Sequence, residues 1–552
     1  MTRYAMVADL ERCVGCQTCT ASCRHANATS PAVQWRKVLD LEVGSYPNVS
    51  RVFIPVGCQH CEDPPCMHVC PTTATRKRAD GIVTVDYDIC IGCAYCEMAC
   101  PYQARFKIES RHFAYGETAM QNESARDDPR RIGVSQKCTF CSDRIDAGLA
   151  AGLVPGLDPD ATPACVNSCI ADALHFGDLH DPESNVSKLL REQSHFRMHE
   201  ELCTEPGFYY LHDKRHARPS FSEALGKDST DSATAASAGG KGVEPSHQRH
   251  WDWKAATNFM CGGAGAGLFA FVALSGAAGG LSVGLGLVSV GVVAFGLFML
   301  LFKIGRPLRF LYVLRQPQRS WMSREAWIAA VFFPLAMLSL GLASSALAIS
   351  AALFGLLFLF AQAMILKESK GIPAWRSPRI VPLIVVTGVA EGAGLFVLAN
   401  ALVPALAALS IAAAVLAALT ALRHVLWSTY VRGLQVEGVP CRTLEVLEHY
   451  SRRFFTLGFA VPMVLLTSGF ILQDVARALF AIAGVLVFAS GWVLKFILVT
   501  RAAYNEGFAI ERIRGHGSGI ATAVVKPGWT FTSARGFGAR PRTTAAPFDA
   551  TS

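Results

Sequence analysis

The stretch CIGCAYCEMACP, residues 90–101, decides the fold of the first half of the chain. Its cysteines follow the spacing C-x2-C-x2-C-x3-C with a proline next, and residues 13–23 repeat that cysteine spacing. Two further groups extend the pattern: a C-x2-C-x4-C-x3-C group before a proline, and a CxxC pair completed by a later C-x3-C pair. Sixteen of the 19 cysteines belong to these groups: Cys13, Cys16, Cys19, Cys23, Cys58, Cys61, Cys66, Cys70, Cys90, Cys93, Cys96, Cys100, Cys138, Cys141, Cys165 and Cys169.

This spacing is typical of 4Fe–4S ligation. Three thiolates in one short loop can hold three corners of a cubane, and the fourth cysteine ligates a neighbouring cluster, as in two-cluster ferredoxins. Structural zinc sites instead show separated CxxC pairs or mixed Cys/His sets, and disulfides would consume the thiolates that the motif needs. Four quartets therefore predict four 4Fe–4S clusters, and a row of clusters predicts electron transfer.

The chain of 552 residues divides by composition into two unlike halves. Residues 1–215 are rich in cysteine and charge, whereas residues 251–505 carry long apolar runs with few charges. Residues 216–250 are poor in large apolar side chains, which predicts a flexible linker. We therefore expect an α+β tandem ferredoxin-like iron–sulfur domain, the linker, an all-α eight-helix transmembrane bundle, and a C-terminal tail over residues 506–552.

The iron–sulfur half repeats itself. Short β-like runs such as MVADL, RVFIPV and GIVTVDY accompany the cysteine groups, as duplicated strand–loop–helix units would. The groups at 58–70 and 90–100 are close in sequence, so we expect them to share one module. The groups at 13–23 and 138–169 then share the other module, and the polar stretch 105–137 is expected to be an inserted loop.

The second half contains eight apolar runs of the length that a bilayer core requires, about 20 residues as a helix. A soluble helical bundle would not need so many long runs with so few charges. The predicted spans are residues 254–278, 281–302, 326–345, 347–366, 380–403, 406–427, 454–473 and 477–500.

Basic residues gather in the loops after the second, fourth and sixth predicted spans. They are Lys303, Arg306, Arg309, Arg315, Arg319, Arg324, Lys367, Lys370, Arg376, Arg379, Arg423, Arg432, Arg442, Arg452 and Arg453. The opposite loops hold few, Arg477 being the main exception. The basic side of a membrane protein faces the cytoplasm, and an even number of spans puts both termini there.

We therefore expect a multi-pass protein of the bacterial inner membrane whose cluster domain faces the cytoplasm. No apolar leader precedes Cys13, in agreement with this orientation. The formal net charge of +8 then largely reflects the basic loops that set the orientation in the membrane, and no nucleic-acid partner is expected.

A haem-carrying anchor would need histidines that face each other inside the spans. The second half offers only His424 and His449, both at or beyond the ends of predicted spans, so we expect no haem. Electrons would then pass directly between the nearest cluster and a membrane-soluble carrier, for which a quinone (ubiquinone or menaquinone) is the natural candidate.

Four polar residues are candidates for quinone binding or proton exchange: Lys303, Arg306, Glu391 and His424. Glu391 lies in an apolar span, where ionisable groups are costly and mark functional sites, although a neighbouring helix could neutralise it. Lys303 and Arg306 end the second span, where snorkelling to the surface is the alternative role. His424 could relay a proton because its ordinary pKa is near neutrality. Arg423 and His424 end the sixth predicted span, where snorkelling is again the alternative role, and Lys495 inside the last span is expected to snorkel.

Residues 1 to about 200, with CQHCEDPPCMHVCPTTA and CIGCAYCEMACPYQA, resemble the four-cluster iron–sulfur subunit of dimethyl sulfoxide reductase-type molybdoenzymes. Residues 251 to about 510, with GRPLRFLYVLRQPQRSWMSREAW, resemble the haem-free DmsC/NrfD-type membrane anchor of the same enzymes. The chain is thus similar to two subunits fused in one. The resemblance implies a separate catalytic subunit that carries molybdopterin-guanine dinucleotide, so this chain itself would be a non-catalytic electron-transfer subunit.

The resemblance also implies which cysteines share a cluster. From the catalytic subunit to the membrane, the four sets would be Cys13, Cys16, Cys19 and Cys169; Cys138, Cys141, Cys165 and Cys23; Cys58, Cys61, Cys66 and Cys100; and Cys90, Cys93, Cys96 and Cys70. Nitrate reductase relatives have a Trp at the place of Cys93 and a three-iron cluster there. The cysteine present here implies a 4Fe–4S cluster.

Two departures and two alternatives remain at this stage. Lys303 stands where the dimethyl sulfoxide reductase anchor has a quinone-linked histidine, and the charged loops indicate the cytoplasm, as in the cytoplasm-facing sulfite dehydrogenases of this family. One alternative function is a quinol-linked subunit of another respiratory complex, for example with a multihaem cytochrome. The other is a non-catalytic redox sensor.

Overall fold

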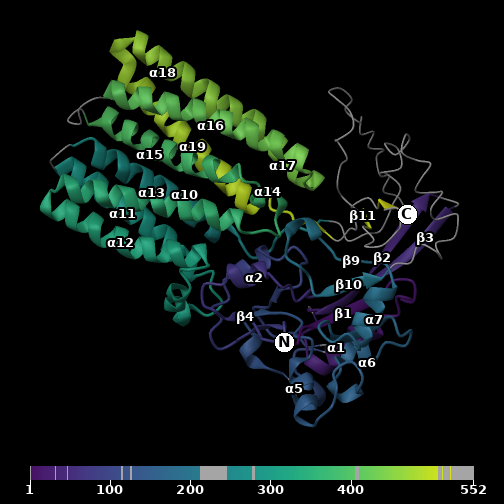
Figure 1. Cartoon of the computed structure of the whole chain (residues 1–552). Coiled ribbons are helices and arrows are strands. Elements are labelled where there is room, and N and C mark those ends of the chain that lie inside the picture. The colour runs from purple at the N-terminus through teal and green to yellow at the C-terminus, as the bar shows by residue number, and fades with distance from the viewer. Residues whose placement is uncertain are drawn as a thin grey trace.

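The computed structural model describes residues 2–211, 245–276, 280–403 and 409–507, apart from short gaps. The gaps are residues 32, 46–47, 114–115 and 125–126, and the pairs 512–513 and 522–523 are also described. Most of the predicted linker and of the predicted C-terminal tail lie outside the described residues. The first half forms a ferredoxin-like domain of strands and short helices, and the second half forms a bundle of long apolar helices whose one end rests on it (Figure 1).

The cluster domain is organised on a four-stranded sheet in the order β8-β1-β10-β9. Its strands are β1 (Tyr4–Asp9), β8 (Leu174–Asp178), β9 (His195–Phe196) and β10 (Phe208–Leu211). Strand β1 pairs with β10 in parallel and with β8 antiparallel. Alternation along β1 places Met6 and Ala8 in the core that contains the cysteines, and Val7 in a small cluster with Val186 on the opposite face.

Two hairpins, one longer-range strand pair and several short helices surround this sheet. The hairpins join β2 (Arg36–Ser45) to β3 (Asn48–Gly57) and β4 (Thr75–Lys77) to β5 (Val83–Val85). The strand pair is β6 (Phe106–Lys107) with β7 (Ser135–Gln136), which are antiparallel and far apart in the sequence. The helices are α1 (Thr18–Asn27), α2 (Pro65–His68), α3 (Tyr95–Met98), α4 (Gln121–Ser124), α5 (Ser142–Ala150), α6 (Ala164–Asn167) and α7 (Asn185–Glu192).

The stretch 105–137 is more than the predicted polar loop. It is closed at its base by the β6–β7 pair and carries α4 and the 3-10 turn η1 (Pro129–Arg131). Several of its polar side chains are buried, among them Arg105 and Lys137, which are only 2% and 1% exposed. The polar sequence did not reveal which of these charges the tertiary fold encloses.

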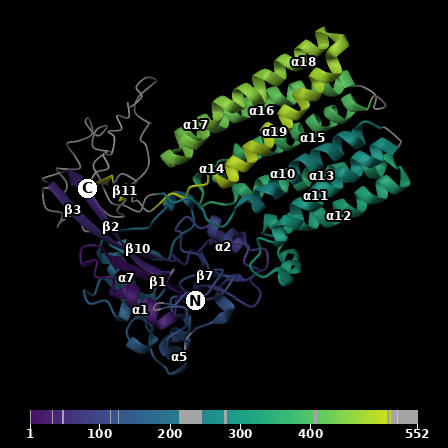
Figure 2. The same cartoon turned by 180° about the vertical axis from the view of Figure 1, so that it is seen from behind.

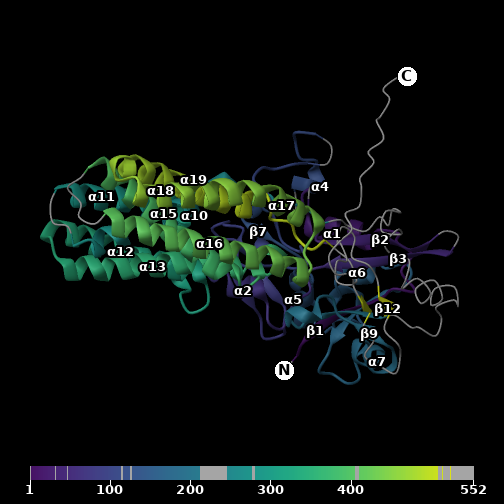
Figure 3. The same cartoon turned by 90° about the horizontal axis from the view of Figure 1, so that it is seen from above.

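The second half holds eight helical segments long and apolar enough to cross a membrane. They lie side by side and run roughly along one direction (Figures 1 and 3). The helices are α10 (Trp253–Leu274), α11 (Gly280–Leu301), α12 (Trp321–Leu342), α13 (Ser345–Lys367), α15 (Ile380–Leu402), α16 (Leu409–Glu437), α17 (Cys441–Phe455), α18 (Val461–Ile471) and α19 (Ala476–Thr500). A π-helical turn, η6 (Thr456–Ala460), joins α17 and α18 into one span.

Two predicted spans differ from the helices that form. The sixth was predicted to end at residue 427, but α16 continues to Glu437, and the seventh begins at Cys441 rather than at 454. Apolar content marks where a helix can meet lipid, whereas both helices extend beyond that zone on the side of the cluster domain (Figure 1).

Close helix packing at the centre of the bundle depends on glycine. A Cβ added at Gly267 in α10 would lie 2.4 Å from the carbonyl oxygen of Gly388 in α15. A Cβ at Gly392, one turn further along α15, would lie 2.1 Å from the Gly267 carbonyl carbon. Small residues four apart let two backbones touch, which is the usual way that membrane helices associate.

The cluster domain meets the bundle through backbone contacts around a short connection after α11. The Gly305 amide donates to the Gly92 carbonyl at 3.4 Å, and the Arg306 amide donates to the Ile91 carbonyl at 3.0 Å. Gly92 and Gly133 both have a positive φ (70° and 72°), which glycine adopts without cost. Carbonyls and glycines thus replace side chains at this junction, and the cysteine loop comes directly against the anchor.

Other contacts extend this junction across several helices. The Tyr95 hydroxyl donates to the Ile365 carbonyl at 2.8 Å, the Gly371 amide donates to the Met98 carbonyl at 3.0 Å, and the Ser320 hydroxyl donates to the Val69 carbonyl at 2.8 Å. One hydrophobic cluster combines Cys66, Cys96 and Tyr95 with residues of the bundle. Figure 2 shows the same arrangement from behind, with α2 and β7 facing the end of the bundle.

The glycine junction makes a prediction. Gly305→Ala would place a methyl group 1.9 Å from the Gly133 carbonyl oxygen, so the junction has to open, at a cost of about 1–3 kcal/mol in unfolding free energy. Thermal unfolding of the detergent-solubilised chain measures this loss. Gly291→Ala in α11 is the matched control, because its Cβ meets nothing within 4 Å; equal unfolding temperatures for the two variants would contradict the account.

Candidate iron–sulfur sites and buried polar groups of the bundle

All 19 cysteines are free thiols, and sixteen of them gather in four groups. Each group is recognised from the electrostatic interactions of one thiol with three others. The groups, called sites I to IV here, are Cys13 with Cys16, Cys19 and Cys169; Cys23 with Cys138, Cys141 and Cys165; Cys61 with Cys58, Cys66 and Cys100; and Cys93 with Cys70, Cys90 and Cys96.

Local helical turns explain why the last cysteine of a sequence motif belongs to a different site from the cysteines before it. Helix α1 carries Cys19 and Cys23, and the single turns α2 and α3 carry Cys66 and Cys96. Four residues advance a helix by about 6 Å. Cys23, Cys70 and Cys100 follow the cysteines named above by four residues, and each therefore reaches the neighbouring site. This exchange joins sites I and II in one module and sites III and IV in the other.

The loops before these helices repeat one backbone conformation. Gly15 and Gln17 have positive φ angles of 70° and 62°, and Gly92 and Ala94 have values of 70° and 60°. Left-handed residues at alternate positions turn the chain sharply, which lets one loop surround a compact group. The repeated sequence spacing thus corresponds to a repeated fold.

The four sites form a series from the protein surface to the bundle. Cys16 of site I is exposed. Cys165 of site II interacts with Cys19 of site I, and Cys138 of site II interacts with Cys58 of site III. At the far end, the Cys93 carbonyl of site IV accepts a hydrogen bond from the Trp251 indole at 3.3 Å.

The chemistry of these thiols fits a metal cluster. Burial raises the pKa of Cys96, Cys100 and Cys165 to about 12 each, so these groups bind protons tightly unless a cation replaces the proton. Ligation of iron by these thiolates would supply that replacement, and metal binding would then be coupled to folding. Sixteen cysteines in four sets of four match the donor set of 4Fe–4S clusters.

Lys303 and Arg306 lie at the junction near site IV. The Lys303 ammonium is 3.4 Å from the Asp252 carboxylate, which caps the start of α10, and burial lowers the pKa of Lys303. A guanidinium nitrogen of Arg306 donates to the Pro129 carbonyl at 3.4 Å. The Arg306 side chain is therefore tied to the cluster domain, whereas the Lys303 side chain is tied to the start of α10 and its carbonyl accepts from Lys107 of the cluster domain at 3.4 Å.

Glu391 lies deep in the bundle and is paired. Its carboxylate accepts a hydrogen bond from Lys495 at 2.6 Å, and both side chains are fully buried. The prediction that Lys495 snorkels to the surface is wrong: a fixed carboxylate within reach holds its ammonium inside. Gly263 and Gly491 make room for the pair, since a Cβ at Gly263 would lie 2.0 Å from the Lys495 nitrogen.

Arg423 and His424 do not end a span, because α16 continues well beyond them. Arg423 is fully buried and donates to the carbonyls of Val487 (2.9 Å) and Gly458 (2.8 Å). The π-helical turn η6 contains Gly458, and such turns alter the regular helix ladder. Snorkelling of Arg423 is therefore wrong. The His424 ring stacks on Phe459 at 4.4 Å between ring centroids.

The four candidate quinone residues thus do not form one site. Lys303 and Arg306 are at the junction, Glu391 is paired with Lys495 inside the bundle, and His424 packs against an aromatic ring.

The structure also reveals a second buried carboxylate, Glu325 in α12, which accepts from the Asn258 amide at 3.1 Å. The sequence did not indicate this role because Glu325 lies near the polar start of an apolar span, where an exposed carboxylate is also common.

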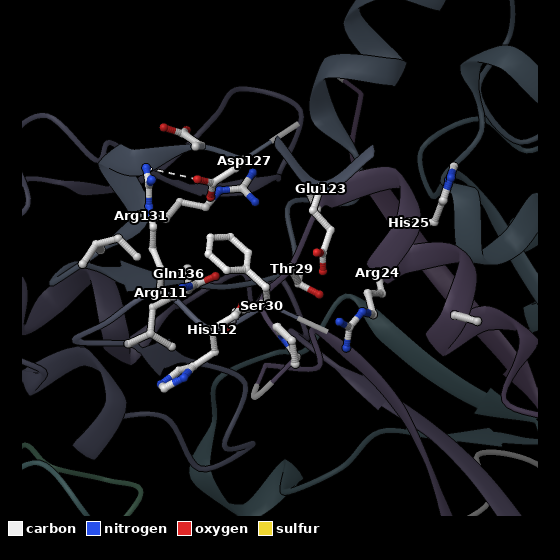
Figure 4. A pocket seen from close by; sticks show the side chains of 17 residues that line it. Arg24, His25, Thr29, Ser30, Arg111, His112, Glu123, Asp127, Arg131 and Gln136 are labelled. Carbon is white, nitrogen blue, oxygen red and sulfur yellow. Dashed lines mark hydrogen bonds and ion pairs between the residues drawn. The ribbon is translucent and has the colours of Figure 1, made fainter. Parts of the chain in front are cut away.

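A cavity of about 700 Å³ opens on the cluster domain between α1 and the stretch 108–136. Figure 4 shows Arg24 and Glu123 on one side of it and Asp127, Arg111 and His112 on the other. Arg111 pairs with Asp127 at 3.0 Å, so opposite charges partly neutralise each other. None of the lining residues belongs to the membrane helices, which separates this cavity from the junction at site IV.

Comparisons with known proteins agree with this architecture. Residues 49–116 match the 4Fe-4S dicluster domain family. The selenate reductase B subunit of Mesobacillus selenatarsenatis is 41% identical over 223 residues, which cover 38% of this chain and 72% of the relative. The putative dimethyl sulfoxide reductase iron-sulfur B subunit of Halobacterium salinarum is 39% identical over 254 residues (43% and 90%). The sulfite dehydrogenase B subunit of Allochromatium vinosum is 40% identical over 228 residues (38% and 83%).

The fold and the cysteine sites define an iron–sulfur electron-transfer subunit with a multi-pass membrane region. The chain belongs to the family of iron–sulfur B subunits of dimethyl sulfoxide reductase-type enzymes, extended by eight membrane helices. This confirms the predicted fold class and the resemblance to the iron–sulfur subunit of these enzymes.

The buried pair of Glu391 and Lys495 makes a second prediction. Lys495→Met leaves a buried carboxylate without its partner, which costs about 3–5 kcal/mol in unfolding free energy. The double variant Glu391→Gln/Lys495→Met removes both charges and recovers most of that loss. Thermal unfolding in detergent, arranged as a double-mutant cycle, gives the coupling; strictly additive losses would show that the two side chains are independent.

Proposed function

We propose that this chain carries electrons through four 4Fe–4S clusters between a molybdopterin-guanine dinucleotide catalytic subunit and the quinone pool. The observation that supports the proposal is the order of the sites: site I is exposed through Cys16, and site IV touches the bundle through Cys93. The clusters, when bound, act as one-electron carriers. The chain's own residues hold them in series and deliver the two ends to different partners.

The catalytic partner is inferred from the relatives. Those compared above are named as B subunits of selenate reductase, dimethyl sulfoxide reductase and sulfite dehydrogenase. A B subunit implies a separate subunit that performs the substrate chemistry. Mass spectrometry of the complex purified from native membranes identifies that subunit; a multihaem cytochrome in its place would favour the alternative respiratory complex.

The quinone is proposed to bind at the junction, beside site IV. Lys303 and Arg306 are two of the basic groups there, and either could donate to a quinone oxygen. Their neighbours support this position, because the Arg306 amide is bonded to Ile91, the residue after Cys90. A quinone at the junction needs no haem to carry electrons further into the membrane.

Proton exchange is proposed for Glu391, with His424 as a further relay on α16. Glu391 has one exchangeable partner, Lys495, so a proton can move between carboxylate and amine within the bundle. Arg423 adds a fixed positive charge that interacts with the Glu391 carboxylate. Ionisable groups inside a membrane region are rare, and proton relays are among the functions that they serve.

The cluster domain is proposed to face the cytoplasm of the bacterial inner membrane. The basic connections that follow α11 and α13 both contact it: Arg309 donates to the Cys90 carbonyl at 3.2 Å, and Gly371 donates to Met98. Since the basic side of a membrane protein is cytoplasmic, the domain attached to these connections would lie on that side.

Iron content tests the four-cluster assignment. Anaerobically purified chain should contain about 16 irons, by the four-iron count of each cluster, and Cys93→Ser should lose about one of them by forming a three-iron species at site IV. Quinone-linked activity should fall while the remaining clusters assemble. Iron analysis and electron paramagnetic resonance measure both effects; zinc in place of iron would refute the assignment.

The proton role of Glu391 is tested separately from its stability role. The double variant Glu391→Gln/Lys495→Met has no exchangeable carboxylate, so its quinol turnover should fall about tenfold or more, by the usual contribution of a positioned acid or base. Activity with a soluble dye should persist, because it bypasses the bundle. Equal losses in both assays would indicate a structural role only.

A further inference from the structure

Each module of the cluster domain encloses one arginine that has no carboxylate partner among the described residues. Arg36 is 1% exposed and Arg105 is 2% exposed. An arginine cannot lose its charge in a protein, and a buried charge without compensation is strongly unfavourable. The countercharge must therefore come from another group close to each guanidinium.

Arg36 lies between sites I and II. It interacts electrostatically with Cys19 of site I and with Cys138 and Cys165 of site II. One guanidinium nitrogen donates to the Met6 sulfur at 2.9 Å, and the guanidinium stacks over the Phe208 ring at 4.9 Å. Its other two nitrogens are buried and have no hydrogen-bond partner among the described atoms, so they are donors without an acceptor.

Arg105 occupies the equivalent place between sites III and IV. It interacts with Cys58, Cys66 and Cys100 of site III and with Cys96 of site IV. One guanidinium nitrogen donates to the Cys66 sulfur at 3.1 Å, and another donates to the Thr75 hydroxyl at 3.0 Å. The two modules thus place an arginine at the same point relative to their paired sites.

The middle gap, between sites II and III, also contains a buried base. Lys137 is 1% exposed and donates to the Cys138 carbonyl at 2.6 Å. It interacts with Cys138 of site II and with His60, which stands between two ligands of site III in the sequence. A buried basic side chain therefore stands at each of the three gaps in the series.

We propose that Arg36 and Arg105, with Lys137 between them, are positioning residues that raise the reduction potentials of the clusters on either side. The inference rests on the proposed function, since it requires clusters at sites I to IV. A cluster held by four thiolates is an anion, and each added electron increases that negative charge. A fixed positive charge between two such anions stabilises the reduced form of both and weakens their mutual repulsion, because charges interact strongly where water is excluded.

The geometry also limits how far each charge acts. The thiols with which Arg36 interacts most strongly belong to sites I and II, and those with which Arg105 interacts most strongly belong to sites III and IV. Removing one arginine should therefore change the reduction potentials of its two neighbouring clusters and leave those of the other two clusters unchanged. A general loss of stability would not divide the four clusters in this way.

The test is a potentiometric titration of the anaerobically purified full chain, followed by electron paramagnetic resonance. Arg36→Met should lower the midpoint potentials of the clusters at sites I and II by at least about 59 mV each. This shift corresponds to a tenfold change in the one-electron equilibrium constant. Arg105→Met should lower the other two, and the double variant should lower all four. Arg36→Lys and Arg105→Lys keep the charge and should shift the potentials less.

Arg78→Gln is the matched control, because Arg78 belongs to the same domain but pairs with Asp80 and Asp146 near the surface. It should leave all four potentials unchanged. Unaltered potentials in a methionine variant with full iron content would overturn the inference, as would a shift of the same clusters by both arginine variants.

Variants that fail to assemble are also informative. If methionine prevents cluster assembly, Arg36→Gln and Arg105→Gln replace it, since they keep hydrogen-bond donors without the charge. Loss of clusters in the methionine, glutamine and lysine variants alike would show a purely structural role and overturn the inference. Fewer than four clusters in the unmodified chain would contradict the proposed function instead, so the two failures are distinguishable.

Discussion

Burial of thiolates is the constraint on which the rest of the structure depends. The domain encloses most of its sixteen clustered cysteines, and burial alone drives their pKa values upward. A low-dielectric interior tolerates thiolates only beside cations, whether iron or the guanidinium groups of Arg36 and Arg105. The short helices, the left-handed loops and the buried basic residues all serve to bring negative sulfur and positive charge together.

The same constraint explains why the anchor is joined so closely. Electrons can leave site IV only across a short distance. The junction keeps this distance short because backbone and glycine meet there instead of layers of side chains. Gly92, Gly133 and Gly305 meet there, and Trp251 contacts the Cys93 carbonyl. Inside the bundle, Gly263 in α10 and Gly491 in α19 leave space for the pair of Glu391 and Lys495.

Much of this architecture was accessible from the sequence. Cysteine spacing reflects local loop geometry, so the iron–sulfur character of the first half could be predicted, and hydropathy marked the eight helices long and apolar enough to cross a membrane. The failures concern partners far apart in the chain. The role of Lys495 depends on a carboxylate 104 residues away, and the burial of Arg423 depends on carbonyls of α19 and η6. Arg36 and Arg105 look like ordinary surface residues in the sequence because nothing local indicates which charges the fold encloses.

The central claim is that the clusters exchange electrons with a quinone held by the anchor. The direct measurement is to reduce the purified chain anaerobically, remove the reductant, add a lipophilic quinone in detergent, and follow the cluster signals by electron paramagnetic resonance. The account predicts that the quinone reoxidises all four clusters, since the sites form one connected series. Clusters that stay reduced with quinone, yet are reoxidised by a soluble dye, would contradict it.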